Sequence, residues 1–275
     1  RAQLNQYPGN MNKSYEGFLK SDLLWTNTEF GLEQFVLEND KLDYTRLWPV
    51  PKKLRLGHQV EHIYLQLLKA SNKYKVLAHS IQLIEYKRTL GELDFIIKSL
   101  ATDEIIHIEL AYKFYLIDST IDDVAERLVG PNRGDAFTYK LDKTKNKQLP
   151  LLYSDAAKAR LDIDVYKVKQ KVAFYGEIFT PYQMDNQNMG MLNSKSIKGC
   201  YIPLNLFITE DFSSYKFHFP TKSEWIHIPY SNVKWMDYES AIRIIKERHA
   251  INHSPMIWIY KGKGLIEKMF VTNWG

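Results

Sequence analysis

The 275-residue sequence contains one cysteine, Cys200, and few glycines or prolines (13 and 10). A single cysteine cannot form an intramolecular disulfide or a cysteine-based zinc cluster, and it fits a reducing compartment. So few glycines and prolines exclude collagen-like and low-complexity chains. No run approaches the roughly 20 apolar residues of a membrane span, and the N-terminus lacks the basic-then-apolar pattern of a signal peptide. We therefore expect a cytoplasmic protein without membrane association.

The composition nevertheless supplies a core, because 45% of the residues are hydrophobic and 13% are aromatic. The net charge of +5 is concentrated in one stretch. Residues 139–172 carry nine lysines and arginines against four aspartates. Such a stretch is either a phosphate-facing surface or an ordinary solvated helix face, and the sequence leaves both interpretations open.

Hydrophobic periodicity predicts a mixed α/β chain in three parts. The parts are an N-terminal extension with a helix (1–53), a core followed by a long helix (54–182) and a C-terminal α+β accessory region (183–275). We expect helices at 28–37, 56–67, 122–127, 154–174 and 238–249, and strands at 75–86, 89–97, 104–117, 201–208, 225–229, 256–260 and 265–272. The first three strands follow one another closely, as in an antiparallel meander.

The third of these strands has one apolar and one polar face. Side chains alternate along a strand, so the even positions from 106 to 116 form a wholly apolar or aromatic surface. The odd positions present His107, Glu109, Ala111, Lys113 and Tyr115. An acid and a lysine therefore point the same way from a strand whose other face packs on a helix.

The preceding strand repeats this arrangement. Alternation places Leu93, Phe95 and Ile97 on one face, and Glu92 and Asp94 on the other. Two neighbouring strands thus each carry carboxylates on a polar face. For one strand alone, a surface charge pair is the simpler interpretation, and the two strands together favour a functional site.

These carboxylates have a chemical use. Asp94 and Glu109 are suited to hold Mg²⁺, or Mn²⁺ in its place, because such hard ions prefer carboxylate oxygens and retain several waters. The ion would lower the pKa of a bound water and neutralise charge on a phosphate. Lys113 would orient or deprotonate the attacking water, or stabilise the pentavalent phosphate.

Two central segments carry the acids and the lysine: Thr89-Leu90-Gly91-Glu92-Leu93-Asp94-Phe95 and His107-Ile108-Glu109-Leu110-Ala111-Tyr112-Lys113-Phe114-Tyr115-Leu116. These two segments resemble the PD-(D/E)XK nuclease superfamily, and together with other segments they resemble a bacterial family catalogued as domain-of-unknown-function family 1853. Weaker matches are Asp22-Leu23-Leu24-Trp25, Gly130-Pro131 with Asp135, Lys140-Leu141, Gln148-Leu149 and Phe270-Val271-Thr272-Asn273-Trp274. The resemblance covers most of the chain, and the segment 183–251 matches only loosely.

The resemblance implies a restriction-endonuclease-like core of helix, three-stranded meander, helix and further strand, with a helical N-terminal and a mixed α+β C-terminal addition. It implies a Mg²⁺-dependent nuclease acting on DNA, branched or otherwise structured. Asp94 and Glu109 would take the places of the metal-binding acids and Lys113 that of the catalytic lysine, while Glu61, Glu92 and His107 would assist. Lys140, Lys143, Lys147 and Gln148 would contact the phosphates of the nucleic acid.

One departure from the superfamily pattern leaves a second function open. The superfamily has Glu-x-Lys, whereas Ala111 stands at that position here and the lysine follows at Lys113. The side-chain parity is kept, but the Cα atom moves by about 6–7 Å along the strand. A nuclease-like nucleic-acid-binding or interaction module that does not cleave is therefore the alternative.

A remoter alternative is a zinc peptidase. His58, Glu61 and His62 have the His-x-x-Glu-His order of inverted zinc peptidases, in which two histidines one helical turn apart bind the metal. A third ligand would have to come from elsewhere, and two histidines on a solvated helix edge are the simpler interpretation. Cys200 has no context of a nucleophile, and neither a serine-hydrolase elbow nor a phosphate-binding glycine loop is present.

Overall fold

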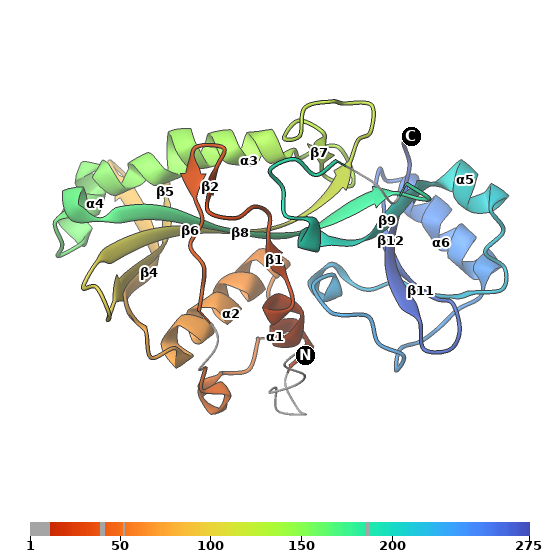
Figure 1. Ribbon diagram of the computed structural model, residues 1–275, viewed down its shortest axis with the longest axis horizontal. Helices are drawn as coiled ribbons and strands as arrows, with labels where there is room; N and C mark the ends of the chain where they lie inside the picture. The colour runs from red at the N-terminus through yellow and green to blue at the C-terminus, as the bar shows by residue number, and fades with distance from the viewer. Residues whose placement is uncertain (1–11, 39–41, 52, 185–187) are drawn as a thin grey trace. The chain divides into compact units, whose positions relative to one another are not determined.

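The computed structural model describes residues 12–38, 42–51, 53–184 and 188–275 and has a mixed α/β architecture (Figure 1). The chain divides into two compact units. The first unit comprises residues 1–112 and 141–175, and the second comprises residues 113–140 and 176–275. Two long strands, β6 and β8, begin in the first unit and end in the second.

The first unit contains most of the elements that precede residue 175. They are α1 (Lys13–Leu19), β1 (Asp22–Leu23), β2 (Thr28–Glu29), β3 (Leu32–Glu33), η1 (Tyr44–Arg46), α2 (Leu56–Ala70), β4 (Tyr74–Glu85), β5 (Arg88–Ser99), the start of β6 (Ile105–Ile117), the end of α3 (Phe137–Lys143), η2 (Thr144–Gln148), η3 (Leu149–Tyr153), α4 (Asp155–Arg160), η4 (Val165–Lys167) and the start of β8 (Lys169–Pro181). Strands β4, β5 and β6 pair antiparallel in chain order, β8 lies beside β6, and β1 pairs with β8. The predicted meander is confirmed.

The second unit contains the ends of β6 and β8 and the C-terminal elements. Its other elements are β7 (Leu128–Val129), the start of α3, η5 (Ser194–Ser196), β9 (Ile197–Pro203), α5 (Leu204–Thr209), β10 (Lys216–His218), η6 (Lys222–Glu224), α6 (Tyr238–His249), β11 (Met256–Tyr260) and β12 (Ile266–Thr272). Strands β8, β9 and β12 pair parallel, and β12, β11 and β10 pair antiparallel. The predicted helix at 238–249 and the closing hairpin are confirmed.

Helices cover both faces of the meander. On one face lies α2, whose apolar positions recur at helical spacing and whose Tyr64 meets Phe95 of β5 edge-on. On the other face lie η3 and α4, where Leu152 and Ala157 pack with Ile81 of β4 and Leu93 of β5. Burying both faces stabilises the meander, since each fully buried large apolar side chain contributes about 1.5–3 kcal/mol.

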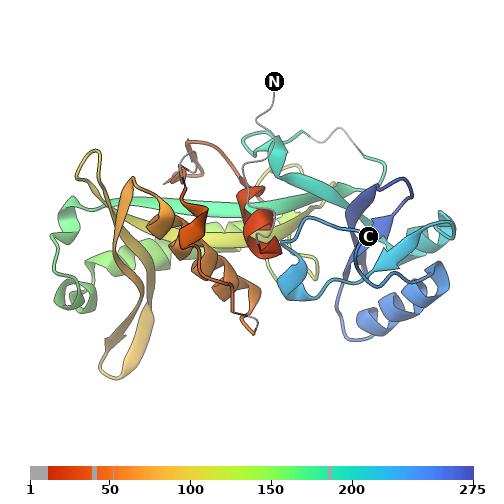
Figure 2. The same cartoon turned by 90° about the horizontal axis from the view of Figure 1, so that it is seen from below.

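The joined ends of β4 and β5 form a hairpin that extends beyond α2 in Figure 2. Its register pairs Glu85 with Arg88, so the loop consists of Tyr86 and Lys87 alone. Both loop residues have positive φ, 46° and 64°. Positive φ at both positions is typical of the type I′ hairpin loop, whose twist matches that of the flanking strands.

Two predicted helices of the first unit are wrong. Residues 28–33 form the β2–β3 hairpin, because Phe30 and Gly31 adopt positive φ and turn the chain back on itself, and residues 35–37 are irregular. The predicted helix 154–174 begins correctly at Ser154, whose hydroxyl caps α4, but that helix ends at Arg160. Strand β8 follows, because its β-branched and aromatic residues are buried beside β6.

Three predictions in the second unit also need correction. The predicted helix at 122–127 is a set of turns in which Asp123 accepts hydrogen bonds from the Ala125 and Glu126 amides. The predicted strand at 201–208 ends at Pro203, which has no amide proton to continue the ladder and is the N-cap residue of α5. The predicted strand at 225–229 is irregular and follows η6. No helix in the described ranges has both the length and the apolar character needed to cross a membrane.

Candidate active site

Side-chain alternation in β5 is interrupted at Asp94. Phe95 faces α2, and so does Glu92, whose pKa is raised by burial and by the charge of Glu61 on that helix. Leu93 and Ile96 instead belong to the cluster on the opposite face. Positions 92 and 95 cannot share a face in a regular strand, so the alternation breaks between them. The expected common face of Glu92 and Asp94 is therefore wrong.

Strand β4 carries a matching break opposite Asp94. Its partner positions are Ile81 with Leu93 and His79 with Phe95, which leaves Ser80 across from Asp94. Ser80 has φ of 48°, in the left-handed region that side chains other than glycine seldom adopt. Backbone strain of this kind is often found at functional sites, where the surrounding fold holds it in place.

The carboxylate of Asp94 is turned toward β6. Its Oδ2 accepts a hydrogen bond of 2.8 Å from the Leu110 amide. The β5–β6 ladder runs from Lys98–Ile105 to Phe95–Ile108 and ends there, so this amide lies beyond the last paired residues. The carboxylate takes the place of a ladder partner, and this contact holds Asp94 beside Glu109, the neighbour of Leu110 in β6.

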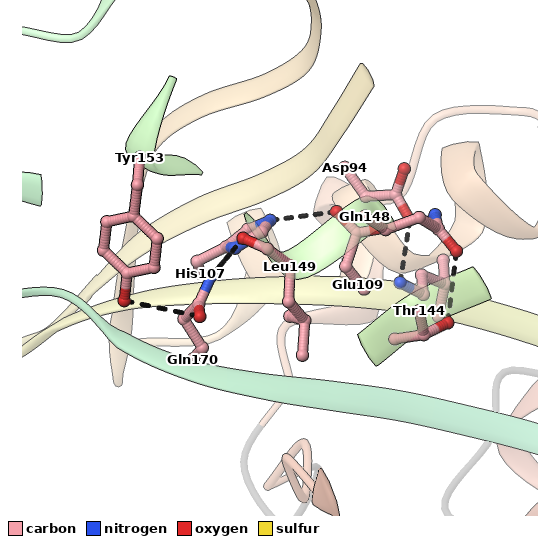
Figure 3. A network of polar contacts seen from close by, with 9 residues as sticks. Asp94, His107, Glu109, Thr144, Gln148, Leu149, Tyr153 and Gln170 are labelled. Carbon is pink, nitrogen blue, oxygen red and sulfur yellow. Dashed lines mark hydrogen bonds and ion pairs between the residues drawn. The ribbon is translucent and has the colours of Figure 1, made fainter. Parts of the chain in front are cut away.

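Glu109 is fully buried and belongs to a polar network (Figure 3). Its Oε1 lies 2.9 Å from Nε2 of His107, which is also fully buried. Its Oε2 accepts a hydrogen bond of 2.5 Å from the side-chain amide of Gln148. Both carboxylate oxygens are thus held by donors from two different elements, β6 and η2.

The hydrogen bonds of Gln170, at the start of β8, fix the tautomer of His107. Its amide nitrogen donates to the Leu149 carbonyl at 2.7 Å, and because a carbonyl can only accept, the orientation of the amide is determined. The same nitrogen lies 3.1 Å from Nδ1 of His107, which must then accept. The ring proton is therefore on Nε2 and points at Glu109. Burial lowers the pKa of His107 to about 4, with the charge of Asp94 opposing, so the ring is neutral at physiological pH.

Gln148 is positioned by the segment that precedes it. The turn from Thr144 to Gln148 is a π-helix, a conformation that recurs at functional sites. The buried Thr144 hydroxyl donates to Oε1 of Gln148 at 3.1 Å, which directs the amide nitrogen toward Glu109. The sequence placed Gln148 among the phosphate contacts, and in the structure its amide is bonded to Glu109.

Lys113 lies on the part of β6 that belongs to the second unit. Its ammonium group is 2.6 Å from a carboxylate oxygen of Asp135, which lies in the same unit. Both side chains are partly exposed, at 36% and 42%. The predicted catalytic lysine is therefore engaged in an ion pair of its own. Ala111, at the position where the superfamily has its lysine, is buried.

Glu61 and Glu92 form a separate acidic pair between α2 and β5. Glu61 also lies 3.1 Å from Nδ1 of the exposed His58, one turn earlier on α2. His62 lies on the same helix with its Nε2 buried. Among the described residues, no three His, Cys, Asp or Glu side chains converge as a metal-binding group, so the zinc interpretation finds no third ligand there.

The predicted phosphate contacts lie on α3 and η2. Lys143 and Lys147 are exposed, one turn apart, and Lys140 is half-buried. Further along the basic stretch, lysines pair with acids: Lys158 with Asp155, Lys167 with Asp164, Lys169 with Glu104 and Lys171 with Glu33. Cys200 is a half-buried free thiol on β9.

Sequence reasoning missed Thr144, Ser80 and Gln170. Thr144 has no sequence signal of its own, because nothing distinguishes a threonine inside a basic helical stretch from its polar neighbours. Gln170 does have a signal: it is the one uncharged polar residue at the start of an apolar run. Assigning that run to a helix hid the fact that Gln170 begins a strand beside β6.

A family model described as a domain of unknown function (DUF1853) matches residues 14–268. Neither the curated proteins nor the solved structures contain a significant match.

Proposed function

The chain belongs to the DUF1853 family, and we propose that this member is a Mg²⁺-dependent nuclease with a PD-(D/E)XK-like core that hydrolyses phosphodiester bonds in DNA, including branched or structured DNA. The observation that carries the proposal is the pair of acids at the end of the β5–β6 ladder. Asp94 is turned toward β6 by a paired break in β4 and β5, and Glu109 next to it is buried and held by two donors. Backbone strain and a buried carboxylate are both features that cluster at functional sites.

The order of elements in the first unit agrees with the proposal. Helix α2 is followed by the meander β4–β6, then by the helical segment from α3 to α4, and then by β8. This is the order of helix, meander, helix and strand that the sequence resemblance implies. The two acids lie on the two strands of the meander that the resemblance assigns to them.

The donor set suits Mg²⁺ better than zinc. The imidazole of His107 is not available as a ligand, because Nε2–H donates to Glu109 and Nδ1 accepts from Gln170. The groups that remain are carboxylate oxygens, which are the ligands of hard ions, and Mg²⁺ is commonly bound by only one or two carboxylates with waters and substrate phosphate. The ion, when bound, would lower the pKa of a water and offset charge on the phosphate.

The protein's own residues prepare the site before any ligand arrives. His107 and Gln148 fix the orientation of Glu109, and Leu110 fixes that of Asp94. Preorganised carboxylates lose little side-chain entropy when a ligand binds. The exposed Lys143 and Lys147 would receive the phosphates of the substrate strand.

Metal binding and cleavage test the proposal together. Asp94→Asn should weaken Mn²⁺ binding in calorimetry by roughly tenfold or more and abolish metal-dependent cleavage of plasmid, branched and single-stranded DNA. The matched control is Asp162→Asn, which removes an exposed carboxylate of the first unit outside the site. Wild-type Mn²⁺ affinity in Asp94→Asn, or equal losses in both variants, would contradict the assignment.

The ion pair between Lys113 and Asp135 favours the second candidate, a nucleic-acid-binding module that does not cleave. If Lys113 serves catalysis, Lys113→Ala should lower cleavage by roughly 10²-fold while DNA binding changes little. Ala111→Lys combined with Lys113→Ala keeps the side-chain parity and restores the superfamily spacing. Should the wild type cut no DNA or RNA with Mg²⁺ or Mn²⁺, and Ala111→Lys create cleavage, the binding module is the better description.

A further inference from the structure

The hairpin that joins β4 and β5 ends in a cluster of large exposed side chains. Tyr86 is 92% exposed, Ile84 is 58% exposed and Leu90 is 41% exposed. Lys87 and Arg88 are exposed beside them. Within the ranges that the structure describes, neither cation forms an ion pair, although Glu85 stands opposite Arg88 in the register. We refer to residues 84–90 as the hairpin tip.

The two-residue loop is poorly suited to its conformation. Positive φ at both loop positions strongly favours sequences such as Asn-Gly, because side chains with a Cβ are strained there. The chain instead has Tyr86 and Lys87 at φ of 46° and 64°. A hairpin selected for stability alone would not place its largest exposed aromatic side chain and a lysine at these positions. We therefore expect the side chains of Tyr86 and Lys87 to have a role other than stabilising the hairpin.

The chemistry of the hairpin tip fits a nucleic acid. Proteins that open or kink a base step insert an apolar or aromatic wedge and hold the flanking phosphates with lysine and arginine. Tyr86 with Ile84 and Leu90 supplies the wedge, and Lys87 with Arg88 supplies the cations. The apolar residues alone would suit a protein partner equally well. The two cations at the end of the hairpin favour a nucleic acid, because they can pair with phosphates.

Strand β5 connects the hairpin tip to the acidic pair, because it runs from Arg88 to Ser99 and includes Asp94, and its pairing with β4 shifts register between Leu83 and Ile84. Six residues of strand span about 20 Å. Successive nucleotides of a duplex strand lie about 3.4 Å apart along the axis, so this distance corresponds to about six base pairs. A nucleic acid that reaches the acids from this side would meet the hairpin tip about half a helical turn away.

We propose that the hairpin tip is a wedge for nucleic acid: Tyr86 stacks on a base at an opened step, and Lys87 and Arg88 contact the adjacent phosphates. The choice of partner rests on the proposed function, but the wedge would act in binding and does not depend on cleavage. It implies a substrate that is branched or easily unstacked about six base pairs from the acids.

The test replaces the strained loop by one that favours the fold. Tyr86→Asn with Lys87→Gly should raise Tm by roughly 2–5 °C, because Asn-Gly relieves the positive-φ strain. In the same protein, binding to a labelled branched junction, with Ca²⁺ in place of Mg²⁺, should weaken by roughly tenfold or more. Tyr86→Asn alone separates the ring from the charge, and Trp48→Ala removes another exposed aromatic side chain of the first unit as a control.

The outcomes distinguish this proposal from the proposed nuclease. Weaker junction binding by a more stable Asn-Gly variant supports the wedge. A second supporting result concerns 2-aminopurine placed in the junction: its fluorescence should rise when the wild type binds and should not rise with the variant. Unchanged affinity in the Asn-Gly variant, or no DNA binding by the wild type, overturns it. Neither result bears on the metal site, because the Mn²⁺ titration of Asp94→Asn measures ion binding in the absence of nucleic acid.

Discussion

The buried histidine of the polar network leads to a prediction about stability and pH. The Gln170 amide donates to Nδ1 of His107, so protonating the ring would set a second donor against that amide. Turning the amide over would place its oxygen against the Leu149 carbonyl. The folded state therefore resists protonation of His107, in agreement with a pKa lowered by burial from 6.5 to about 4.

The magnitude follows from proton linkage. As the pH falls, the unfolded chain binds a proton at His107 near pH 6.5, whereas the folded protein does so only near pH 4. The unfolded state binds more protons in this window, so the free energy of unfolding decreases from about pH 7 to pH 4 and levels off below it. The free energy of unfolding falls by roughly 3 kcal/mol in total, and about 2 kcal/mol of this decrease occurs between pH 8 and pH 5.

The assay compares wild type with His107→Gln in urea unfolding at pH 8 and pH 5, in EDTA. Glutamine can donate to Glu109 and accept from Gln170 but does not titrate, so its stability should fall by about 2 kcal/mol less over this range. His79 and His253, whose pKa values are also lowered by burial, contribute equally to both proteins and cancel. Equal pH dependence in the two proteins, or an NMR signal showing the His107 proton on Nδ1, would refute the reasoning.

Two further predictions concern charges elsewhere. Reversing Lys140, Lys143 and Lys147 to Glu should weaken DNA binding. It should also reduce the slope of log affinity against log salt concentration by roughly one for each lysine that contacts a phosphate. An unchanged slope in a salt titration would show that these lysines are only solvated. In the second unit, buried Lys268 donates to both oxygens of buried Glu177 and to the Trp225 carbonyl. Lys268→Met should lower the free energy of unfolding by roughly 3–5 kcal/mol, because it removes the cation that offsets the buried charge of Glu177. The double variant Lys268→Met with Glu177→Leu should recover most of that loss in urea unfolding, and an equal loss in both variants would contradict this.

The meander could be predicted because strand alternation is a local property. The apolar face of β6 at even positions and the polar face with His107 and Glu109 follow directly from the period of two. The helix at 56–67 could also be predicted, because its apolar residues recur at helical spacing and not at the spacing of a strand. The structure extends this helix to Ala70. Local patterns do not, however, say that the polar face of β6 lies buried beneath η2 and η3. That required tertiary contacts.

Strand β8 was misassigned because its sequence satisfies both periods. Val165, Val168, Val172 and Tyr175 recur at steps of three and four, as on one face of a helix. Yet every residue from Val172 to Thr180 is buried, which suits a strand covered on both faces. Periodicity cannot distinguish a buried strand from a buried helix, and the pairing of β8 with β6 decides between them.

The position of Asp94 shows that strand alternation alone does not determine which acids lie together. Counted from the hairpin end, alternation places Asp94 with Glu92 against α2; counted from the ladder with β6, it places Asp94 with Glu109. Both counts cannot hold in one regular strand. The break opposite Ser80 resolves the conflict by giving Glu92 to the helix and Asp94 to Glu109. The strained backbone of β4 is thus what separates one acid of the Gly-Glu-Leu-Asp segment from the other, and a search for metal-binding acids on strands should weigh such breaks as heavily as parity.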